Sequence, residues 1–280
     1  MLPFMPELPE VETVRRGLID VLQGQTLCRV EVNRPDLRRP FPARLKERLE
    51  GRVVTGLGRR AKYLLLTLDD GWVLLAHLGM SGRFVVDPPE PWRAGPHDHV
   101  VFATTERRRV VFQDPRRFGL LDLVAGDALA THPLLSDLGP EPLADSFTAG
   151  VLATALGGRS GPIKTALLDQ HVIAGLGNIY VSESLYRAGI DPARPAGAIG
   201  KAATARLVDA IKTVLTEAIA AGGSSLRDHR RPDGELGYFQ HSFAVYGREG
   251  EPCPRCDCAT GVRRIVQSGR ATFYCAKQQR

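Results

Sequence analysis

Apolar residues alternate with polar ones through most of the first half of the chain, which is the pattern of half-buried β-strands. Residues 63–78 place Asp70 and Gly71 between two apolar runs, a strong hairpin signal, and 100–113 predict a second hairpin with a charged turn. Residues 6–24 predict a helix, because glutamates lie near its start and a glycine follows its last apolar position. The first half therefore predicts a leading helix and a layered, β-rich domain.

The pattern changes after Pro133, where apolar residues recur at helical spacing. Leu207, Ile211, Val214 and Ala218 follow one another at intervals of four, three and four, which places them on one stripe of a helix. Helices are predicted over 147–156, 162–170, 178–190 and 202–223. A polar, glycine-containing segment and a short module with four cysteines complete the chain, so a helical domain and a small metal-like tail are expected after the β-rich domain.

Charge favours an anionic partner. The 280 residues carry a net charge of +6, and residues 226–280 contribute +4 of it, with 10 Lys and Arg against 6 Asp and Glu. A basic surface of this kind is typical of proteins that bind nucleic acid, although charge alone is a weak signal. No apolar run is long enough to span a membrane, and the first residues lack the basic start of a signal peptide. An intracellular protein is therefore expected.

The stretch HVIAGLGN at 171–178 joins two predicted helices and is too apolar for a solvated loop. Its two glycines come just before a helix start, where backbone N–H groups and a close approach favour a bound phosphate. Asn178 would cap this helix and hydrogen-bond a phosphate oxygen. A tight interhelical turn with a purely structural Asn178 cap explains the same residues equally well.

Two turn-forming stretches, HLGMSGRF at 77–84 and DPRRFG at 114–119, pair glycines with apolar and cationic side chains. Met80 and Phe118 have the character of wedges that fill a base stack, and Arg116 could pair with the edge of an orphaned base. An enzyme that works on a base inside duplex DNA must extrude that base and fill the gap. Each stretch alone is also explained as a β-turn with a buried aromatic side chain.

Four of the five cysteines lie close together near the end of the chain, which indicates a metal site before disulfides in an intracellular protein. A C-x-x-C at 253–256, a hairpin and one more cysteine form a zinc-ribbon pattern, but Gln278 stands where a closing C-x-x-C would end. The predicted ligands are Cys253, Cys256, Cys258 and Cys275. A zinc-free hairpin of the same outline is the alternative. Cys28 is expected to be a small buried hydrophobe.

Together these stretches resemble one family, the bacterial formamidopyrimidine-DNA glycosylases, which are base-excision enzymes for oxidised purines. The sister branch of endonuclease VIII-like enzymes is similar in fold but begins Pro-Glu-Gly-Pro, so Leu8 favours the first branch. The matching stretches follow the family's order over nearly the whole chain: PELPEVET at 6–13, GRRAKYLLL at 58–66, HLGMSGRF at 77–84, DPRRFG at 114–119, GLGNIYVSESLYRAGI at 175–190, GYFQHSFAVYGREGEPC at 237–253 and QSGRATFYC at 267–275.

The resemblance implies an α+β multidomain fold with DNA in the cleft between its parts. The N-terminal β-sandwich with a leading helix would span 1–130, and the helix–two-turn–helix domain would span 131–226. A lesion-side loop would span 227–243; it would fold over the extruded base and be mobile without DNA. A C-terminal zinc-finger-like β-hairpin would span 244–280. The resemblance also implies one structural Zn²⁺, no small-molecule cofactor and damaged double-stranded DNA as partner. A monomer in the bacterial cytoplasm, associated with the nucleoid, is expected.

The resemblance further implies roles for individual residues. Pro6 would be the nucleophile, and Glu7 would protonate the deoxyribose ring oxygen. Glu10 would support the site from the first helical turn, and the catalytic Lys62 would hold a phosphate or an oxygen on the lesion side. The other DNA contacts would be His99, Arg117, Lys164, Asn178 and Arg270, of which Arg270 also counts as catalytic, and the base-stack fillers would be Met80, Arg116 and Phe118.

Catalysis by Pro6 depends on a free N-terminus. A free prolyl nitrogen is a secondary amine, and its attack on sugar C1′ leads to an iminium that makes β- and δ-elimination easy. The nitrogen of an internal proline is an amide and is no nucleophile. If translation begins at Met5, removal of that methionine frees Pro6 beside Glu7, whereas a start at Met1 leaves a primary amine and no catalyst. We therefore expect a start at Met5.

Two other functions fit the same sequence. One is a protein that binds DNA lesions on this scaffold without catalysis, which would bind damaged duplex but form no covalent adduct. The other is an endonuclease VIII-like glycosylase, which would remove oxidised pyrimidines faster than 8-oxoguanine and formamidopyrimidines.

Overall fold

The computed structural model describes residues 5–88, 90–224, 232 and 237–280. These residues form two compact units. The first runs to Ser136 and includes Ala221–Tyr238, and the second consists of Asp137–Ala220 and Phe239–Arg280. The predicted helical segments and the cysteine-bearing module therefore belong to the same unit. Most of the predicted lesion-side loop, 227–231 and 233–236, lies outside the described residues.

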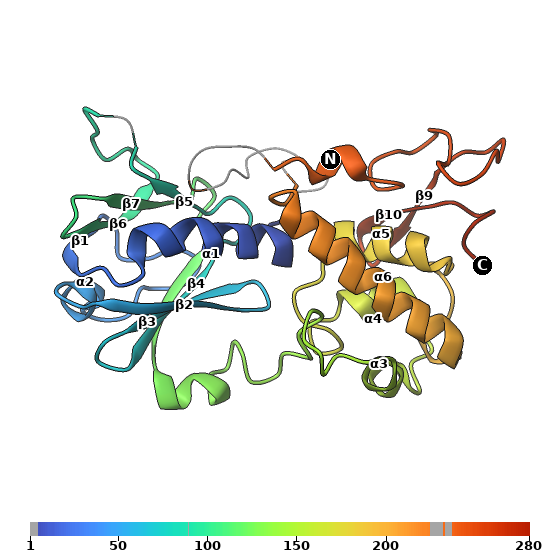
Figure 1. The fold of residues 1–280 in the computed structure, drawn as a ribbon, viewed down its shortest axis with the longest axis horizontal. Coiled ribbons are helices and arrows are strands. Elements are labelled where there is room, and N and C mark those ends of the chain that lie inside the picture. The colour runs from blue at the N-terminus through green and yellow to red at the C-terminus, as the bar shows by residue number, and fades with distance from the viewer. Residues whose placement is uncertain (1–4, 89, 225–231, 233–236) are drawn as a thin grey trace. The chain divides into compact units, whose positions relative to one another are not determined.

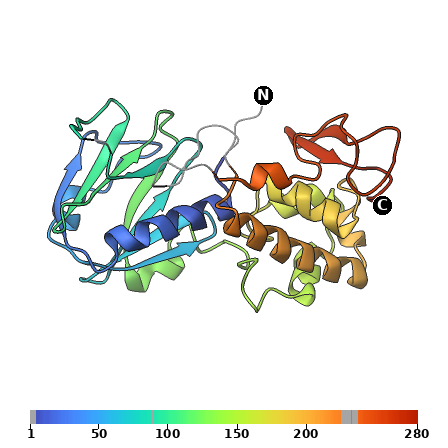
Figure 2. The same cartoon turned by 45° about the horizontal axis from the view of Figure 1, so that its top comes forward.

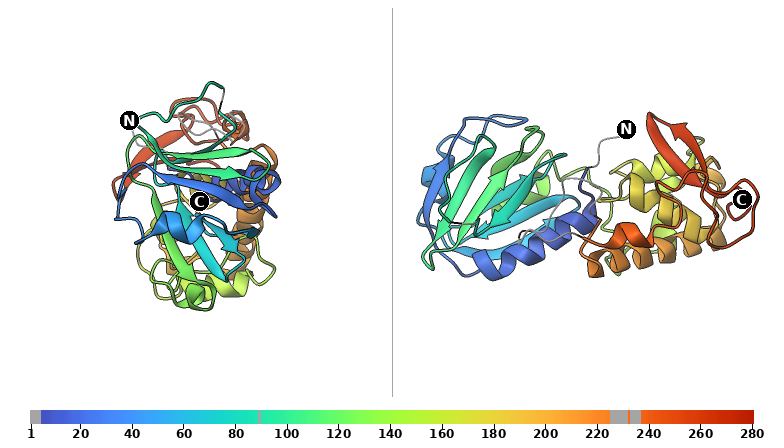
Figure 3. Two further views of the ribbon diagram at one scale, coloured as in Figure 1. Left: turned by 90° about the vertical axis from the view of Figure 1, so that its left-hand side faces the viewer. Right: turned by 90° about the horizontal axis from the view of Figure 1, so that it is seen from above.

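Two four-stranded antiparallel sheets form a β-sandwich in the first unit (Figures 1 and 3), as the resemblance implied. The strand order is β1–β6–β7–β5 in one sheet and β2–β3–β4–β8 in the other. The strands are β1 Leu27–Val32, β2 Val54–Arg60, β3 Tyr63–Leu68, β4 Trp72–His77, β5 Arg83–Val86, β6 Asp98–Thr104, β7 Arg109–Gln113 and β8 Leu120–Ala125, and a 3₁₀ turn, η1, follows at Gly126–Thr131. Both predicted hairpins are confirmed, as β3–β4 and β6–β7.

Helix α1 (Leu8–Leu22) packs into the core of this unit, and the short α2 (Leu45–Leu49) covers its edge. A proline in the first turn suits the helix start, because the missing N–H has no intrahelical partner there. Val14 and Leu18 are fully buried in one apolar cluster with Leu64 of β3 and Phe102 of β6. The core therefore joins α1 to both sheets, which fixes the start of the helix relative to the strand ends.

The second unit is helical and carries a two-stranded hairpin (Figure 2). Its helices are α3 Ala149–Leu156, α4 Ile163–Leu168, α5 Asn178–Ala188 and α6 Lys201–Ala220, with 3₁₀ turns η2 Ala196–Ala198 and η3 Phe239–Ser242 and strands β9 Arg263–Gln267 and β10 Arg270–Tyr274. The stripe predicted from Leu207, Ile211, Val214 and Ala218 is confirmed, since all four side chains are fully buried. Across the part of the chain that the structure describes, no helix is both long and apolar enough to span a membrane.

Two local expectations were wrong. Cys28 is exposed rather than buried, because a β-bulge between Leu27 and Arg29 turns two successive side chains of β1 outward. Asn178 does not cap α5: Gly177 holds the cap position, and Asn178 is the first helical residue. Its side chain is thus released from capping and can reach another segment.

Candidate functional site

The start of α1 holds three of the predicted site residues. Pro6 and Glu7 are buried, and Glu10 has no exposed surface. One Glu10 carboxylate oxygen accepts the Glu7 backbone N–H at 2.9 Å. The other accepts the backbone N–H of Ser224 at 2.8 Å and the Ser224 hydroxyl at 2.9 Å. A carboxylate buried this deeply needs such partners, so Glu10 ties the backbone beside Pro6 to the segment that follows α6.

Lys62 lies in the turn between β2 and β3, and its side chain is half-buried. Its charge acts on His77 at the end of β4, a residue that sequence reasoning passed over. Burial lowers the pKa of the His77 imidazole to about 4, with further contributions from the charges of Lys62 and Arg38. His77 Nδ1 accepts the Gly79 backbone N–H at 2.9 Å, so Nε2 carries the proton in the neutral ring. A neutral imidazole beside a lysine can donate one hydrogen bond without adding charge.

The two wedge-bearing loops contact each other. A Cβ placed on Gly79, the residue before Met80, would lie 2.3 Å from the carbonyl carbon of Phe118, so only glycine permits this approach. The Arg116 backbone N–H donates to the Ser81 hydroxyl at 3.0 Å. The guanidinium of Arg116 also stands over the Phe118 ring, 5.2 Å from its centroid. Met80, Arg116 and Phe118 are thus carried on adjoining loops, as three base-stack fillers would need to be.

Phe118 has the exposure expected of a wedge rather than of a core aromatic. Its side chain is 42% exposed, whereas Phe112 on the strand just before is fully buried. Arg116 and Arg117 are exposed as well. The reading of this stretch as a turn with a buried aromatic therefore does not describe it.

His99 and Arg117, both predicted as DNA contacts, have opposite surroundings. The His99 ring is 2% exposed, and its Nε2 lies 2.8 Å from the backbone carbonyl of Asp114. His99 therefore braces the loop that carries Arg116, and a phosphate contact would require its ring to leave the core. Arg117 is exposed and has a backbone φ of 59°, a left-handed conformation that is uncommon for residues other than glycine.

In the second unit, two predicted site residues donate hydrogen bonds to the same backbone carbonyl. The Ala271 carbonyl accepts the Asn178 amide at 2.9 Å and the Lys164 ammonium at 3.2 Å. Lys164 is fully buried and Asn178 is 9% exposed. Asn178 Oδ1 is buried and has no hydrogen-bond partner among the described residues, while its Nδ2 lies 3.5 Å from the Tyr246 hydroxyl. In this structure both side chains hold the strand that begins at Arg270.

Arg270 is exposed at the start of β10, directly after a two-residue turn. Ser268 and Gly269 form this turn, and both have positive φ, 47° and 73°. Two positive φ values are the mark of the tight turn that matches the twist of a hairpin. The Arg270 side chain is thus carried by a rigid turn whose next carbonyl is fixed by Lys164 and Asn178.

The four predicted metal ligands come together. The Sγ atoms of Cys253, Cys256, Cys258 and Cys275 all lie within 4.8 Å of one another. Cys275 Sγ is 3.6 Å from both Cys256 Sγ and Cys258 Sγ. A tetrahedral Zn²⁺ with Zn–S bonds of about 2.3 Å has S–S edges of about 3.8 Å, so the thiols fit such an ion.

Gln278 takes no place in this cluster. Its side-chain amide donates to the Arg255 carbonyl at 3.3 Å, and Cys258 supplies the fourth sulfur. A cysteine at position 278 is therefore unnecessary for a complete ligand set. The Tyr186 hydroxyl lies 3.3 Å from Cys253 Sγ and supports the cluster from α5.

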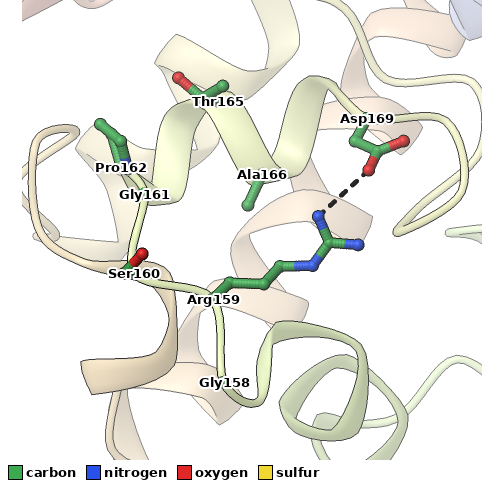
Figure 4. Close-up of a pocket in the computed structure, with 8 residues that line it drawn as sticks. All are labelled: Gly158, Arg159, Ser160, Gly161, Pro162, Thr165, Ala166 and Asp169. Atoms are coloured by element: carbon green, nitrogen blue, oxygen red, sulfur yellow. Dashed lines mark hydrogen bonds and ion pairs between the residues drawn. The ribbon is translucent and has the colours of Figure 1, made fainter.

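A cavity of about 380 Å³ lies in the second unit between the end of α3 and α4 (Figure 4). An ion pair crosses it, with Arg159 Nη1 3.2 Å from Asp169 Oδ2. The charges in the cavity are thus paired with each other, and none of its lining residues is among the predicted site residues. It is not part of the site described above.

Comparison with known families decides which family this site belongs to. Residues 5–121 match the sequence model of the formamidopyrimidine-DNA glycosylase N-terminal domain, and residues 138–230 match that of the formamidopyrimidine-DNA glycosylase H2TH domain. The chain belongs to the formamidopyrimidine-DNA glycosylase family. Its resemblance to the family, inferred above from short stretches, is confirmed.

Relatives in this family match the chain over its full length. The formamidopyrimidine-DNA glycosylase of Rhodospirillum rubrum is 60% identical over 99% of this chain and 100% of its own. The crystal structure of the MutM (Fpg) protein from Thermus thermophilus has a TM-score of 0.85 and 43% identity, with 98% of each chain covered. A Lactococcus lactis Fpg mutant in complex with Fapy-dG containing DNA has a TM-score of 0.89 and 34% identity, covering 98% of this chain and 100% of that one.

Proposed function

We propose that this protein is a base-excision repair enzyme that removes oxidised purines, 8-oxoguanine and formamidopyrimidines, from duplex DNA and then cleaves the strand at the resulting abasic site. The observation that carries this proposal is the full-length similarity to Lactococcus lactis Fpg, a mutant of which is known in complex with Fapy-dG containing DNA. The basic residues 226–280, with a net charge of +4, suit a DNA partner.

In this proposal the Pro6 nitrogen attacks C1′ of the damaged nucleotide. A bond forms between nitrogen and C1′, the bond to the base breaks, and the base leaves with a proton. Glu7 protonates the ring oxygen as the sugar opens. The resulting iminium makes the C2′ and then the C4′ proton acidic, and loss of these protons to a base expels the 3′ and then the 5′ phosphate. Glu10 supports this geometry, because it holds the Glu7 backbone N–H from the first turn of α1.

Pro6 can act in this way only if residues 1–5 are absent, since only then is its nitrogen an amine. The match to the family's N-terminal domain begins at residue 5, directly before Pro6. We therefore propose that the active form begins at Pro6. A terminal amine titrates near pH 8, so a useful neutral fraction is present at neutral pH.

The remaining site residues would hold the DNA. We propose that Lys62 and the neutral His77 face the sugar or phosphate on the lesion side, and that Asn178 and Arg270 contact phosphates flanking the extruded nucleotide. Lys164 would support the strand that carries Arg270 from the protein interior, because its fully buried ammonium donates a hydrogen bond to the Ala271 carbonyl.

Three side chains would enter the duplex and fill the space that the base leaves: Met80, Arg116 and Phe118. Arg117 would add a backbone contact, and His99 would brace its loop.

We also propose one structural Zn²⁺ held by Cys253, Cys256, Cys258 and Cys275. The ion would fix the hairpin that carries Arg270, because it joins Cys275, directly after β10, to the knuckle at 253–258. Its role is structural, since four protein ligands leave no open coordination position.

Product analysis tests the proposed function. The protein that begins at Pro6 is incubated with duplexes that contain 8-oxoguanine, a formamidopyrimidine or an oxidised pyrimidine, and the released base and the strand ends are measured. We expect the two purine lesions to be released faster and to leave a one-nucleotide gap with phosphate at both ends. Binding without release would favour the lesion-binding protein, and faster release of the pyrimidine would favour the endonuclease VIII-like activity.

A further inference from the structure

A buried carboxylate that the mechanism does not use lies on the face of α1 that meets β2. Glu12 is 8% exposed and accepts hydrogen bonds from three arginines. Arg15 donates twice, at 2.9 and 2.8 Å, and Arg16 donates at 2.9 Å. Arg59 of β2 donates its Nε–H at 3.3 Å. Glu12 is therefore the shared acceptor of a network that joins α1 to the second sheet.

Arg59 connects Glu12 to the turn that contains Lys62. The Arg59 side chain is 11% exposed, and its Nη1 donates to the Ala61 carbonyl at 2.9 Å. That carbonyl belongs to the peptide that links Ala61 to Lys62, so the guanidinium holds the peptide plane from which Lys62 starts. A guanidinium fork that binds a carboxylate and a carbonyl at once has little freedom to rotate.

The turn needs such support. Arg60 pairs with Tyr63, so the hairpin closes through Ala61 and Lys62 alone. Ala61 has φ = 52°, a left-handed conformation that is strained for an alanine and persists where its surroundings enforce it. Arg15 makes a second hydrogen bond to the same strand, since its Nη1 donates to the Leu57 carbonyl at 3.0 Å.

We propose that Glu12 is a positioning residue that fixes Lys62 for the reaction through Arg59 and the Ala61 carbonyl. Glu7 caps the same helix directly after Pro6, and Glu10 lies in its first turn, so α1 would position both the nucleophile and Lys62 within one unit. The chemical consequence rests on the proposed function of Lys62. The positioning itself does not, because it is a property of the protein without DNA.

A double-mutant cycle tests the link between Glu12 and Lys62. In the protein that begins at Pro6, Glu12→Gln is expected to slow single-turnover release of 8-oxoguanine by between about tenfold and about 100-fold, as a small misplacement of a catalytic group does. Combined with Lys62→Ala, it should slow release by less than about twofold further, because the residue it positions is gone. A double variant whose defect equals the product of the single defects would overturn the proposal.

Arg16 and Arg59 provide the matched controls. Arg16 donates to the same carboxylate, but its side chain is 59% exposed and leads away into solvent. Arg16→Gln should therefore leave the rate within about twofold of the parent. Arg59→Lys keeps the charge but cannot bind the carboxylate and the carbonyl together, so it should reproduce the Glu12→Gln defect. An unchanged rate in Arg59→Lys would contradict the proposed route.

Amide hydrogen exchange separates this inference from the proposed function. In the DNA-free protein, the amides of residues 61–63 should exchange at least about tenfold faster in Glu12→Gln and in Arg59→Lys, with little change in Arg16→Gln. Unchanged exchange at these amides would overturn the positioning role even if the enzyme is active. Faster exchange there, in a protein that releases no oxidised purine, would uphold the positioning role and contradict the proposed function instead.

Discussion

At the scale of single residues, the buried charges of this molecule are placed where backbone must be held. Glu10 holds the Glu7 N–H, and Lys164 holds the Ala271 carbonyl. Burying a charge is costly unless it is paired or hydrogen-bonded. Each of these groups therefore stabilises one backbone conformation far more than any other conformation. This suits a binding site whose geometry must be set before the substrate binds.

Glu12 gives a prediction about stability against pH. Burial alone raises the pKa of its carboxyl, but hydrogen bonds from Arg15 and Arg16 and the charges of Arg15 and Arg59 outweigh burial and lower that pKa from 4.5 to about 2. A lowered folded-state pKa stabilises the fold above pH 4.5, and this contribution is lost as pH falls toward about 2. We expect about 1–2 kcal/mol at neutral pH, below the full value because water screens Arg16.

Urea unfolding at pH 7 and at pH 3 measures this contribution. The parent should lose more of its unfolding free energy between the two pH values than Glu12→Gln does. An identical loss in both proteins would show that Glu12 is not held as an anion by its arginines.

At the scale of elements, several predicted site residues, among them Lys62, Met80 and Phe118, lie in short connections between strands. The Met80 loop fits against the Phe118 loop only because position 79 is glycine, at φ = 62°.

Gly79→Ala should lower the free energy of unfolding by about 2–4 kcal/mol, since it adds a backbone clash to the strain of a left-handed alanine. Gly51→Ala is the control: φ is 82° but nothing lies within 4 Å, so about 1 kcal/mol is expected. Equal urea midpoints for the two variants would contradict the loop contact.

The cysteine cluster gives a second prediction at this scale. Purified protein should contain one zinc per chain, and Cys258→Ser should lose most of it, because three thiolates hold the ion far less well than four. Gln278→Ala should keep a full complement, since its side chain contacts the Arg255 carbonyl instead. Elemental analysis of the three proteins decides the ligand set, and stoichiometric zinc in Cys258→Ser would remove Cys258 from it.

Sequence reasoning succeeded where the signal was local and periodic. The apolar stripe of α6, the Asp70-Gly71 hairpin and the cysteine cluster each depend on residues a few positions apart or on a known spacing. It failed at Cys28, because a bulge shifts the alternation by one residue. It also missed that Lys164 is buried against a carbonyl 107 residues away, a contact that no local pattern encodes.

At the scale of the whole molecule, the chain consists of two units that each carry part of the predicted site. The first unit holds Pro6, Glu7, Lys62 and the base-stack fillers, and the second holds Lys164, Asn178, Arg270 and the cysteine cluster. In the proposed function the nucleophile belongs to the first unit and Asn178 and Arg270, which would contact the flanking phosphates, belong to the second, so each unit would bind a different part of a large substrate that must be distorted. The proposed chemistry, however, depends on one atom, the nitrogen of Pro6.

Borohydride trapping measures the state of that atom most directly. Two forms of the protein, one beginning at Pro6 and one with all 280 residues, are mixed with a duplex that contains 8-oxoguanine and reduced with borohydride, with Pro6→Gly as the control for the prolyl adduct. We expect the form that begins at Pro6 to become covalently linked to the DNA through the Pro6 nitrogen, and the 280-residue form to bind the duplex without a link at Pro6. Peptide mapping that found no link at Pro6 in the shorter form, or an equal yield of linked DNA from both forms, would contradict the account.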